Sequence, residues 1–320
     1  MKNNNLLALG VLVKRNIKLY LKDKMTVFFS LLAPIIILAL YLLFLGDLQV
    51  DTIMNTLKDY DLENVLTHQD IGAVVNNWMV AGLMGTSCIT VAINTNMVMM
   101  KDKANGNIND MLSSPIKRWV VYLSYIITCF IITFVICFIV LLLAIVYLAA
   151  TGGLMMSFVD FLAIVGVMIL SILSSAAFMI LICGFLKTPA SLGALNGVIS
   201  TAIGFLIGAY MPFSMLPDPI EYVGCFIPGS YSVGLFKEYF LKGCIGKLKL
   251  KIPPGNNVMS VLTKEFSLEL DFFGMRVSTG WMVLALVISL VLFAGLIAIF
   301  YSNKKTNFFM AHKKKAKRRK

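Results

Sequence analysis

Long apolar runs alternate with short polar segments along most of the chain. A helix that crosses the hydrocarbon core of a bilayer needs about twenty apolar residues, at about 1.5 Å each. Six runs reach this length, and we predict transmembrane helices at about residues 26–45, 74–100, 120–148, 161–186, 192–211 and 281–301. Since 59% of the 320 residues are hydrophobic and 14% are charged, we expect an all-α polytopic membrane protein with a single transmembrane domain.

The segment before the first run, residues 1–25, is basic and amphipathic. On a helical wheel four cations share one face: Lys14, Arg15, Lys18 and Lys22. Apolar side chains form the opposite face: Leu6, Leu9, Val13, Ile17 and Tyr20. This pattern predicts an interfacial helix, half-sunk in the cytoplasmic leaflet. We expect no signal peptide, because the basic residues interrupt any apolar core.

Basic residues predict the orientation. Twenty of the 28 Lys and Arg residues lie in segments that six spans would place on one side, including a tail over residues 302–320. By the positive-inside rule that side is the cytoplasm, so both termini are expected there and the acidic segment 46–73 outside. The net charge of +12 is interpreted as topology signals and contacts with anionic lipid, not nucleic acid, because the cations lie beside apolar spans.

The polar segment 101–118 separates the second and third runs and is expected in water on the cytoplasmic side. Asn105-Gly106 indicates a turn, and Asn107 is predicted to cap a short helix that reaches Leu112. Ser114-Pro115 is predicted to begin the next helix, with Ser114 as its cap and Pro115 at the first helical position. From these residues alone, a solvated connector is an equal alternative to a functional helix.

Groups for catalysis are scarce. The only histidines, His68 and His312, lie outside the predicted spans. The spans therefore contain no histidine for a Ser/His hydrolase or a His-ligated metal site. No charged residue lies deep in a span, which disfavours proton-coupled transport through a buried carboxylate. There is no GxxxxGK[ST] phosphate loop, so any ATP that drives the protein must bind to another chain. We expect no catalytic residue, cofactor or metal here.

The six cysteines are scattered. Four lie in predicted spans and are expected to be apolar packing residues: Cys88, Cys129, Cys137 and Cys183. Cys225 and Cys244 both fall on the predicted outer side, where they could form a disulfide or remain thiols.

Two spans carry a small or polar residue at every fourth position. The second-span ladder contains Gly82, Thr86, Thr90 and Asn94. The fifth-span ladder contains Asn196, Ser200, Gly204 and Gly208. Such stripes let helices approach closely and form hydrogen bonds in lipid. They are interpreted either as packing within one subunit or as a subunit interface or polar-lined substrate path.

The region over residues 212–280 is irregular. Prolines and glycines would interrupt a continuous helix: Pro212, Pro217, Pro219, Gly224, Pro228 and Gly229. Its apolar content argues against a freely solvated extracellular loop, which is the alternative.

Three segments, in this order, resemble the permease subunits of type-2 ATP-binding-cassette exporters. They are VKRNIKLYLKDKMTVFFSLLAPIIILALYLLFLG, NGNINDMLSSPIKRW and MPFSMLPDPIEYVGCFIPGSYSVGLFKEYFL. The resemblance implies a six-span subunit that dimerises, with itself or a second permease. It also implies two copies of a separate ATPase subunit, which would carry ATP and Mg.

The same resemblance implies roles for particular segments. Residues 1–25 become a connecting helix, and the fifth span lies near the dimer axis. The coupling helix would contain Asn107, Ile108, Asn109, Asp110, Met111, Leu112, Ser113 and Ser114. Pro217–Leu241 becomes a re-entrant helical hairpin, and an outer gate would contain Pro212, Pro217, Pro228 and Tyr231. The insertion of about residues 242–279 is longer than expected in compact members.

The leading hypothesis is therefore a plasma-membrane permease of an ATP-driven exporter. Its substrate would be a hydrophobic or amphipathic compound, such as a drug, an antimicrobial peptide or a lipid-linked molecule. A channel or secondary transporter that works without ATP is the alternative. A membrane-embedded enzyme is disfavoured by the missing catalytic groups.

Overall fold

Polar caps mark the beginnings of three of the long apolar helices. Thr67 and Asp70 form a capping box at α4 (His68–Thr95), and Ser157 and Asp160 form another at α8 (Phe158–Phe185). Thr188 accepts a hydrogen bond from the amide of Ser191 at the beginning of α9 (Pro189–Leu206). The computed structural model describes residues 2–41, 46–59, 66–252, 259, 262–263, 266, 271–272 and 275–302.

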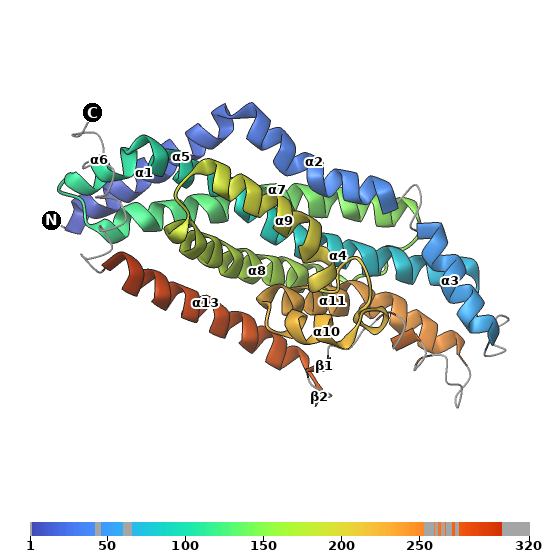
Figure 1. Ribbon diagram of the computed structural model, residues 1–320. Helices are drawn as coiled ribbons and strands as arrows, with labels where there is room; N and C mark the ends of the chain where they lie inside the picture. Colours follow the sequence, from blue (N-terminus) through green and yellow to red (C-terminus); the bar gives the residue numbers. More distant parts are fainter. Residues whose placement is uncertain are drawn as a thin grey trace.

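The described elements are nearly all helical (Figure 1). On the N-terminal side they are α1 (Lys2–Lys22), α2 (Lys24–Leu40), α3 (Gly46–Asp59), α4 (His68–Thr95), α5 (Met97–Asn105), α6 (Asn107–Ser113) and α7 (Arg118–Ala150). They continue with α8 (Phe158–Phe185), α9 (Pro189–Leu206), η2 (Phe213–Met215), α10 (Asp218–Cys225), α11 (Pro228–Lys251) and α13 (Thr279–Ser302). The strands β1 (Asp271–Phe272) and β2 (Met275–Arg276) form one short antiparallel pair.

Five helices of the described chain are long and apolar enough to cross a membrane. They are α4 together with α5, then α7, α8, α9 and α13. The count is up to six if α1 and α2, which bend by 78° at Asp23, form one span. The prediction of an all-α polytopic membrane protein is therefore confirmed. Residues 42–45 of the predicted first span and residues 303–320 of the predicted tail lie outside the described residues.

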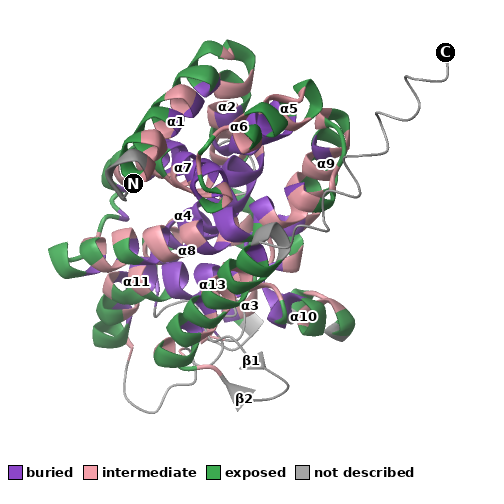
Figure 2. Ribbon diagram, turned by 90° about the vertical axis from the view of Figure 1, so that its left-hand side faces the viewer, coloured by how far each residue is buried: buried purple, intermediate pink, exposed green. Residues whose placement is uncertain are grey.

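The helix α4 forms the centre of the bundle. In the span that contains it, 94% of the most apolar window is buried, against 17% for α9 and for α13. Figure 2 shows buried residues gathered around α4 and a mostly exposed α13. The neighbours of α4 include α7, α8 and α11. Consequently α4 contacts protein on all sides, while α9 and α13 keep open faces.

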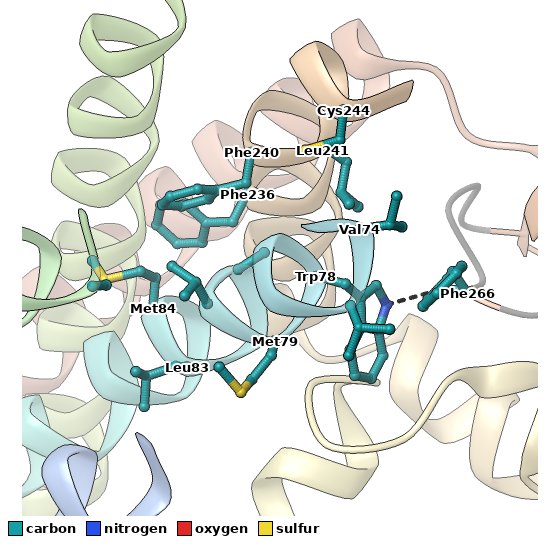
Figure 3. Packing of buried hydrophobic residues seen from close by; sticks show 14 of the residues in the cluster. Val74, Trp78, Met79, Leu83, Met84, Phe236, Phe240, Leu241, Cys244 and Phe266 are labelled. Carbon is teal, nitrogen blue, oxygen red and sulfur yellow. Dashed lines mark hydrogen bonds between the residues drawn. The ribbon is translucent and has the colours of Figure 1, made fainter. Parts of the chain in front are cut away.

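Aromatic side chains join α4 to the irregular region. Phe236 and Phe240 of α11 pack in the same buried cluster as Trp78 of α4 (Figure 3). The Trp78 indole nitrogen donates a 2.9 Å hydrogen bond to the carbonyl of Phe266. Phe236 and Phe240 are thus packed into the protein, whereas Tyr222, Val223 and Phe226 at α10 are exposed. The helix α11 continues ten residues beyond the predicted hairpin end at Leu241. Most of residues 253–270 lie outside the described part.

The buried face of α1 differs from the prediction. Leu12, Asn16 and Tyr20 are at most 8% exposed and form its inner face. Arg15, which was assigned to the basic face, instead turns toward the protein, where its half-buried guanidinium pairs with the buried Asp102. A helical wheel misplaces Arg15 because it does not contain the carboxylate that α5 presents to this side chain.

Candidate functional site

The predicted coupling helix is present as α6, at the same end of the bundle as α1 and the last turn of α13 (Figure 1). Gly106 separates α5 from α6 with φ 84°, a left-handed conformation that glycine adopts without a Cβ clash. The amides of Asn109 and Asp110 donate to the Gly106 carbonyl. Two helices therefore meet in a sharp turn at this end.

Two predicted caps are wrong. Asn107 is the first helical residue of α6, and its side chain forms no cap because its amide nitrogen donates to Asp102 at 2.8 Å. Ser114 ends α6 and donates to the carbonyl of Met111, while α7 begins only at Arg118. In both cases a tertiary or C-terminal partner takes the polar group that local sequence assigned to an N-cap.

The helix α6 is amphipathic. Ile108 is 1% exposed and packs in a cluster with Val120 and Val121 of α7. Met111 and Leu112 are half-buried against the same cluster. The opposite side is exposed and polar, and consists of Asn109, Asp110 and Ser113. An anchored short helix with a free polar face is suited to docking against another protein.

A partly buried ion pair, Arg15–Asp102, lies next to α6. Asp102 is 3% exposed and accepts two hydrogen bonds from the Arg15 guanidinium, at 2.7 and 2.8 Å. Tyr125 and Asn107 donate to the same carboxylate, at 2.7 and 2.8 Å. Sequence reasoning missed Asp102 because it assigned the whole polar segment to water. A usable signal was present, since Asp102 is the single acidic residue between Asp70 and Asp110 and has a lysine on each side.

The two flanking lysines also reach other helices. Lys101 pairs with Asp23, the residue between α1 and α2. The Lys103 ammonium donates to the carbonyls of Cys183, Gly184 and Leu186, at 2.9, 2.9 and 2.6 Å. These carbonyls belong to the C-terminal end of α8, where the helix leaves acceptors without an internal donor. A cavity of about 200 Å³ is lined by both ion pairs.

The two ladders meet each other within the chain. The Asn196 amide donates to the Asn94 side-chain oxygen at 2.9 Å, and the Ser200 hydroxyl donates to Asn196 at 3.1 Å. Thr86 and Thr90 are buried and donate to carbonyls of α4 itself. These polar groups therefore satisfy one another inside the described bundle.

The ladder glycines are positions of close approach. A Cβ on Gly82 would lie 2.2 Å from the Ala209 carbonyl oxygen, and one on Gly204 would lie 2.0 Å from the Tyr210 ring. Gly208 has φ 65° and the Phe213 ring against it. These contacts favour packing within one subunit at the glycines. The exposed face of α9 consists instead of Gly193, Ala194, Gly197, Val198, Thr201 and Phe205.

The residues of the predicted outer gate lie where helices begin. Pro212 and Pro217 precede η2 and α10, and Pro228 is the first residue of α11. The Tyr231 hydroxyl donates to the Cys225 carbonyl at 2.7 Å, which ties α11 to the end of α10. Cys225 and Cys244 carry thiols and no disulfide joins them. The role of the three prolines and Tyr231 as an outer gate stays a prediction.

Lys237 of α11 is a buried cation that sequence reasoning missed. Its side chain is 3% exposed, lies 4.7 Å from the centre of the Trp78 ring and donates to the Gly208 carbonyl at 2.9 Å. Burial lowers the pKa of Lys237 to about 7. The ammonium thus joins α11, α4 and the end of α9.

In the described part of the chain, no group of three or more His, Cys, Asp or Glu side chains could hold a metal ion.

Comparison with known proteins identifies the family of the chain. A family model described as ABC-2 type transporter matches residues 8–241, a range that includes most of α1, the α5–α6 turn, both ladders, α10 and the first part of α11. A comparison with curated proteins gave no match. Because the matched range covers more than half of the chain, this protein belongs to the ABC-2 type transporter family, as a membrane permease subunit.

Proposed function

We propose that the chain is the permease of an ATP-driven exporter in the plasma membrane, with both termini in the cytoplasm. The observation that carries this proposal is the anchored α6 helix with its exposed polar face. It lies at the end of the bundle that also holds the basic residues of α1 and α5 (Figure 1), which the positive-inside rule assigns to the cytoplasm.

Two separate ATPase subunits would bind ATP and Mg, and each would dock on an α6 helix. Ile108 and Asn107 hold α6 to the membrane helices, so a push on the exposed Asp110 face would be passed to the bundle and not absorbed by a loose loop. Closure of the ATPases would then tilt the spans as rigid bodies and alternate the access of the substrate path.

A second permease subunit, identical or different, would pack on the open face of α9. A Cβ added at Gly193 or Gly197 would meet nothing within 4 Å, and Thr201 lies on the same open face. Small residues at a spacing of four allow helix backbones to approach closely in lipid. This support concerns the face beside the predicted ladder, because Gly204 and Gly208 already contact the chain's own rings.

Membrane lipid would contact α1. A groove of about 470 Å³ between α1 and α7 is lined by Leu6, Leu9, Gly10, Val13, Lys14, Ile17 and Ile127. Its apolar walls suit an acyl chain and the Lys14 ammonium suits an anionic headgroup.

The exported compound would be hydrophobic or amphipathic, such as a drug, an antimicrobial peptide or a lipid-linked molecule. Half-buried groups where α4 and α9 meet are uncharged amides and a hydroxyl, from Asn94, Asn196 and Ser200. Uncharged polar groups among apolar walls favour such compounds over strongly hydrated ions.

The test uses the full chain co-expressed with ATPase subunits. We expect an ATPase to co-purify, and inside-out vesicles to accumulate a lipophilic fluorescent dye only when ATP and Mg are added. Vesicles that carry Glu-to-Gln substitutions in the ATPase are the matched control. Dye movement that persists without ATP, in a preparation that retains no ATPase, would instead establish the channel or secondary transporter.

A further inference from the structure

Three consecutive charged residues of α5 reach three different parts of the protein. Lys101 contacts Asp23 at the α1–α2 bend, Asp102 contacts α1, α6 and α7, and Lys103 contacts the end of α8. Successive residues of a helix point about 100° apart, so three in a row span about 200° of its circumference. One turn of α5 is thereby held in three directions.

The contacts of Asp102 form a closed set. Its two oxygens accept four hydrogen bonds, from the two guanidinium nitrogens of Arg15 and from Asn107 and Tyr125. A bidentate pair of this kind is directional and charge-assisted, and removing one partner leaves a buried charge. Asp102 therefore has no capacity left for an external partner, and its contacts serve the protein's own helices.

Lys103 gives the connection to a further helix. Its ammonium donates to three carbonyls at the end of α8, and α13 packs along α8. The helix α5 also continues the central helix α4, since the Asn96 backbone amide donates to the Ala92 carbonyl and the Asn96 carbonyl accepts from the Met100 amide. The backbone thus joins α5 to α4, while its side chains tie it to α1, α7 and α8.

We propose that Lys101, Asp102 and Lys103 are positioning residues that join α6 to α1, α7 and α8, so that a displacement of α6 moves these helices together. This role rests on the proposed function, in which an ATPase moves α6. The exposed face of α6 receives the movement, and the three side chains of α5 distribute it.

The first test measures geometry in the full chain without an ATPase. Spin labels are attached through Ser113→Cys in α6 and Lys187→Cys after α8, and the distance distribution is recorded in lipid nanodiscs. We expect a narrow distribution for the parent chain, a clearly broadened one for Lys103→Met, and recovery of the narrow one with Lys103→Arg, which keeps a cation that can donate to the carbonyls. The exposed Lys18→Gln is the matched control.

The second test measures coupling in the complex with the ATPase. Asp102→Asn and Lys103→Met are expected to retain the ATPase and its basal hydrolysis, because the face of α6 is unchanged, but to transport about tenfold less dye per ATP, as the loss of hydrogen bonds to charged groups predicts. Asp102→Glu is expected to recover part of the coupling.

Narrow distances and parental coupling in Lys103→Met would overturn the proposal, even if Asp102→Asn fails to fold. Suppose that Lys103→Met broadens the distances but the parent chain never stimulates an ATPase. This result would support the positioning role of the three α5 residues and overturn the proposed function instead.

Discussion

The Asn196 side chain of α9 donates a hydrogen bond to the Asn94 side chain of α4 at 2.9 Å, so the two polar ladders are joined to each other. Hydrogen bonds between membrane helices contribute modestly, because the separated helices find other partners in the unfolded state. We expect Asn196→Ala and Asn94→Ala each to lower the free energy of unfolding in detergent. Their coupling in a double-mutant cycle should be about 0.6 to 2 kcal/mol. Strictly additive effects would show that the bond contributes nothing.

The glycines of α9 provide a matched pair. Gly204→Ala would place a Cβ 2.0 Å from the Tyr210 ring, whereas Gly197→Ala would meet nothing within 4 Å. We expect Gly204→Ala to lower the thermal unfolding midpoint of the detergent-solubilised chain, and Gly197→Ala to leave it within error or raise it through its higher helix propensity. Equal midpoints for the two variants would contradict the packing at Gly204.

The bulkier change Gly197→Leu tests the open face of α9. It should leave the fold intact and reduce cross-linking between permease subunits, because a leucine would hold a neighbouring helix away. The cross-linking uses a cysteine at the adjacent exposed position, through Ala194→Cys. Cross-linking that stays equally efficient in Gly197→Leu would show that no neighbouring helix approaches Gly197 closely. An absence of cross-linking through Ala194→Cys in the parent background would place the second subunit elsewhere.

Lys237 predicts a dependence of stability on pH. Burial lowers its pKa from 10.5 to about 7, so between these values the unfolded chain binds more protons than the folded one. The free energy of unfolding should therefore rise as the pH increases from about 7 to 10.5. Below about 7 this group should cause no further change in it. The thermal midpoint of the parent chain, compared with that of Lys237→Met, is expected to increase across this range.

The variant Lys249→Met is the control for Lys237→Met. It also deletes a lysine ammonium group, but one that is exposed to water in the folded chain. Its curve should run parallel to that of the parent chain. Parallel curves for the parent chain and Lys237→Met would show that Lys237 keeps its proton at high pH in the fold, held by the Trp78 ring and the Gly208 carbonyl.

The exposed face of α6 predicts a loss of coupling without a loss of fold. Asp110→Lys reverses a charge in water, and Met111→Pro disrupts a helix that ends at Ser113. Both variants should insert normally and abolish the stimulation of ATP hydrolysis by substrate. Asp110→Lys should keep the thermal midpoint of the parent chain, whereas Met111→Pro should lower it, because Met111 is half-buried against the cluster on α7. The exposed Lys117→Gln, outside α6, is the control. Parental stimulation in both α6 variants would refute the coupling role.

The sequence by itself determined the membrane spans and several helix ends. Lipid offers the backbone no hydrogen-bond partners, so an apolar run of about twenty residues must be helical wherever it packs. Thr188 before Pro189 likewise caps α9 through local geometry alone. These features depend on neighbours in the chain or on the solvent, which the sequence contains or implies.

Tertiary structure decided which polar groups are buried and what they contact. Asp102 and Arg15 are 87 positions apart. The sequence therefore predicted a solvated Asp102, whereas the fold places the Arg15 guanidinium of α1 against it. The sequence placed Lys237 in an outer segment, whereas the fold encloses it between the Trp78 ring and the end of α9. A buried charge is tolerated only when other elements supply its partners, and this supply is a property of packing that no local pattern contains.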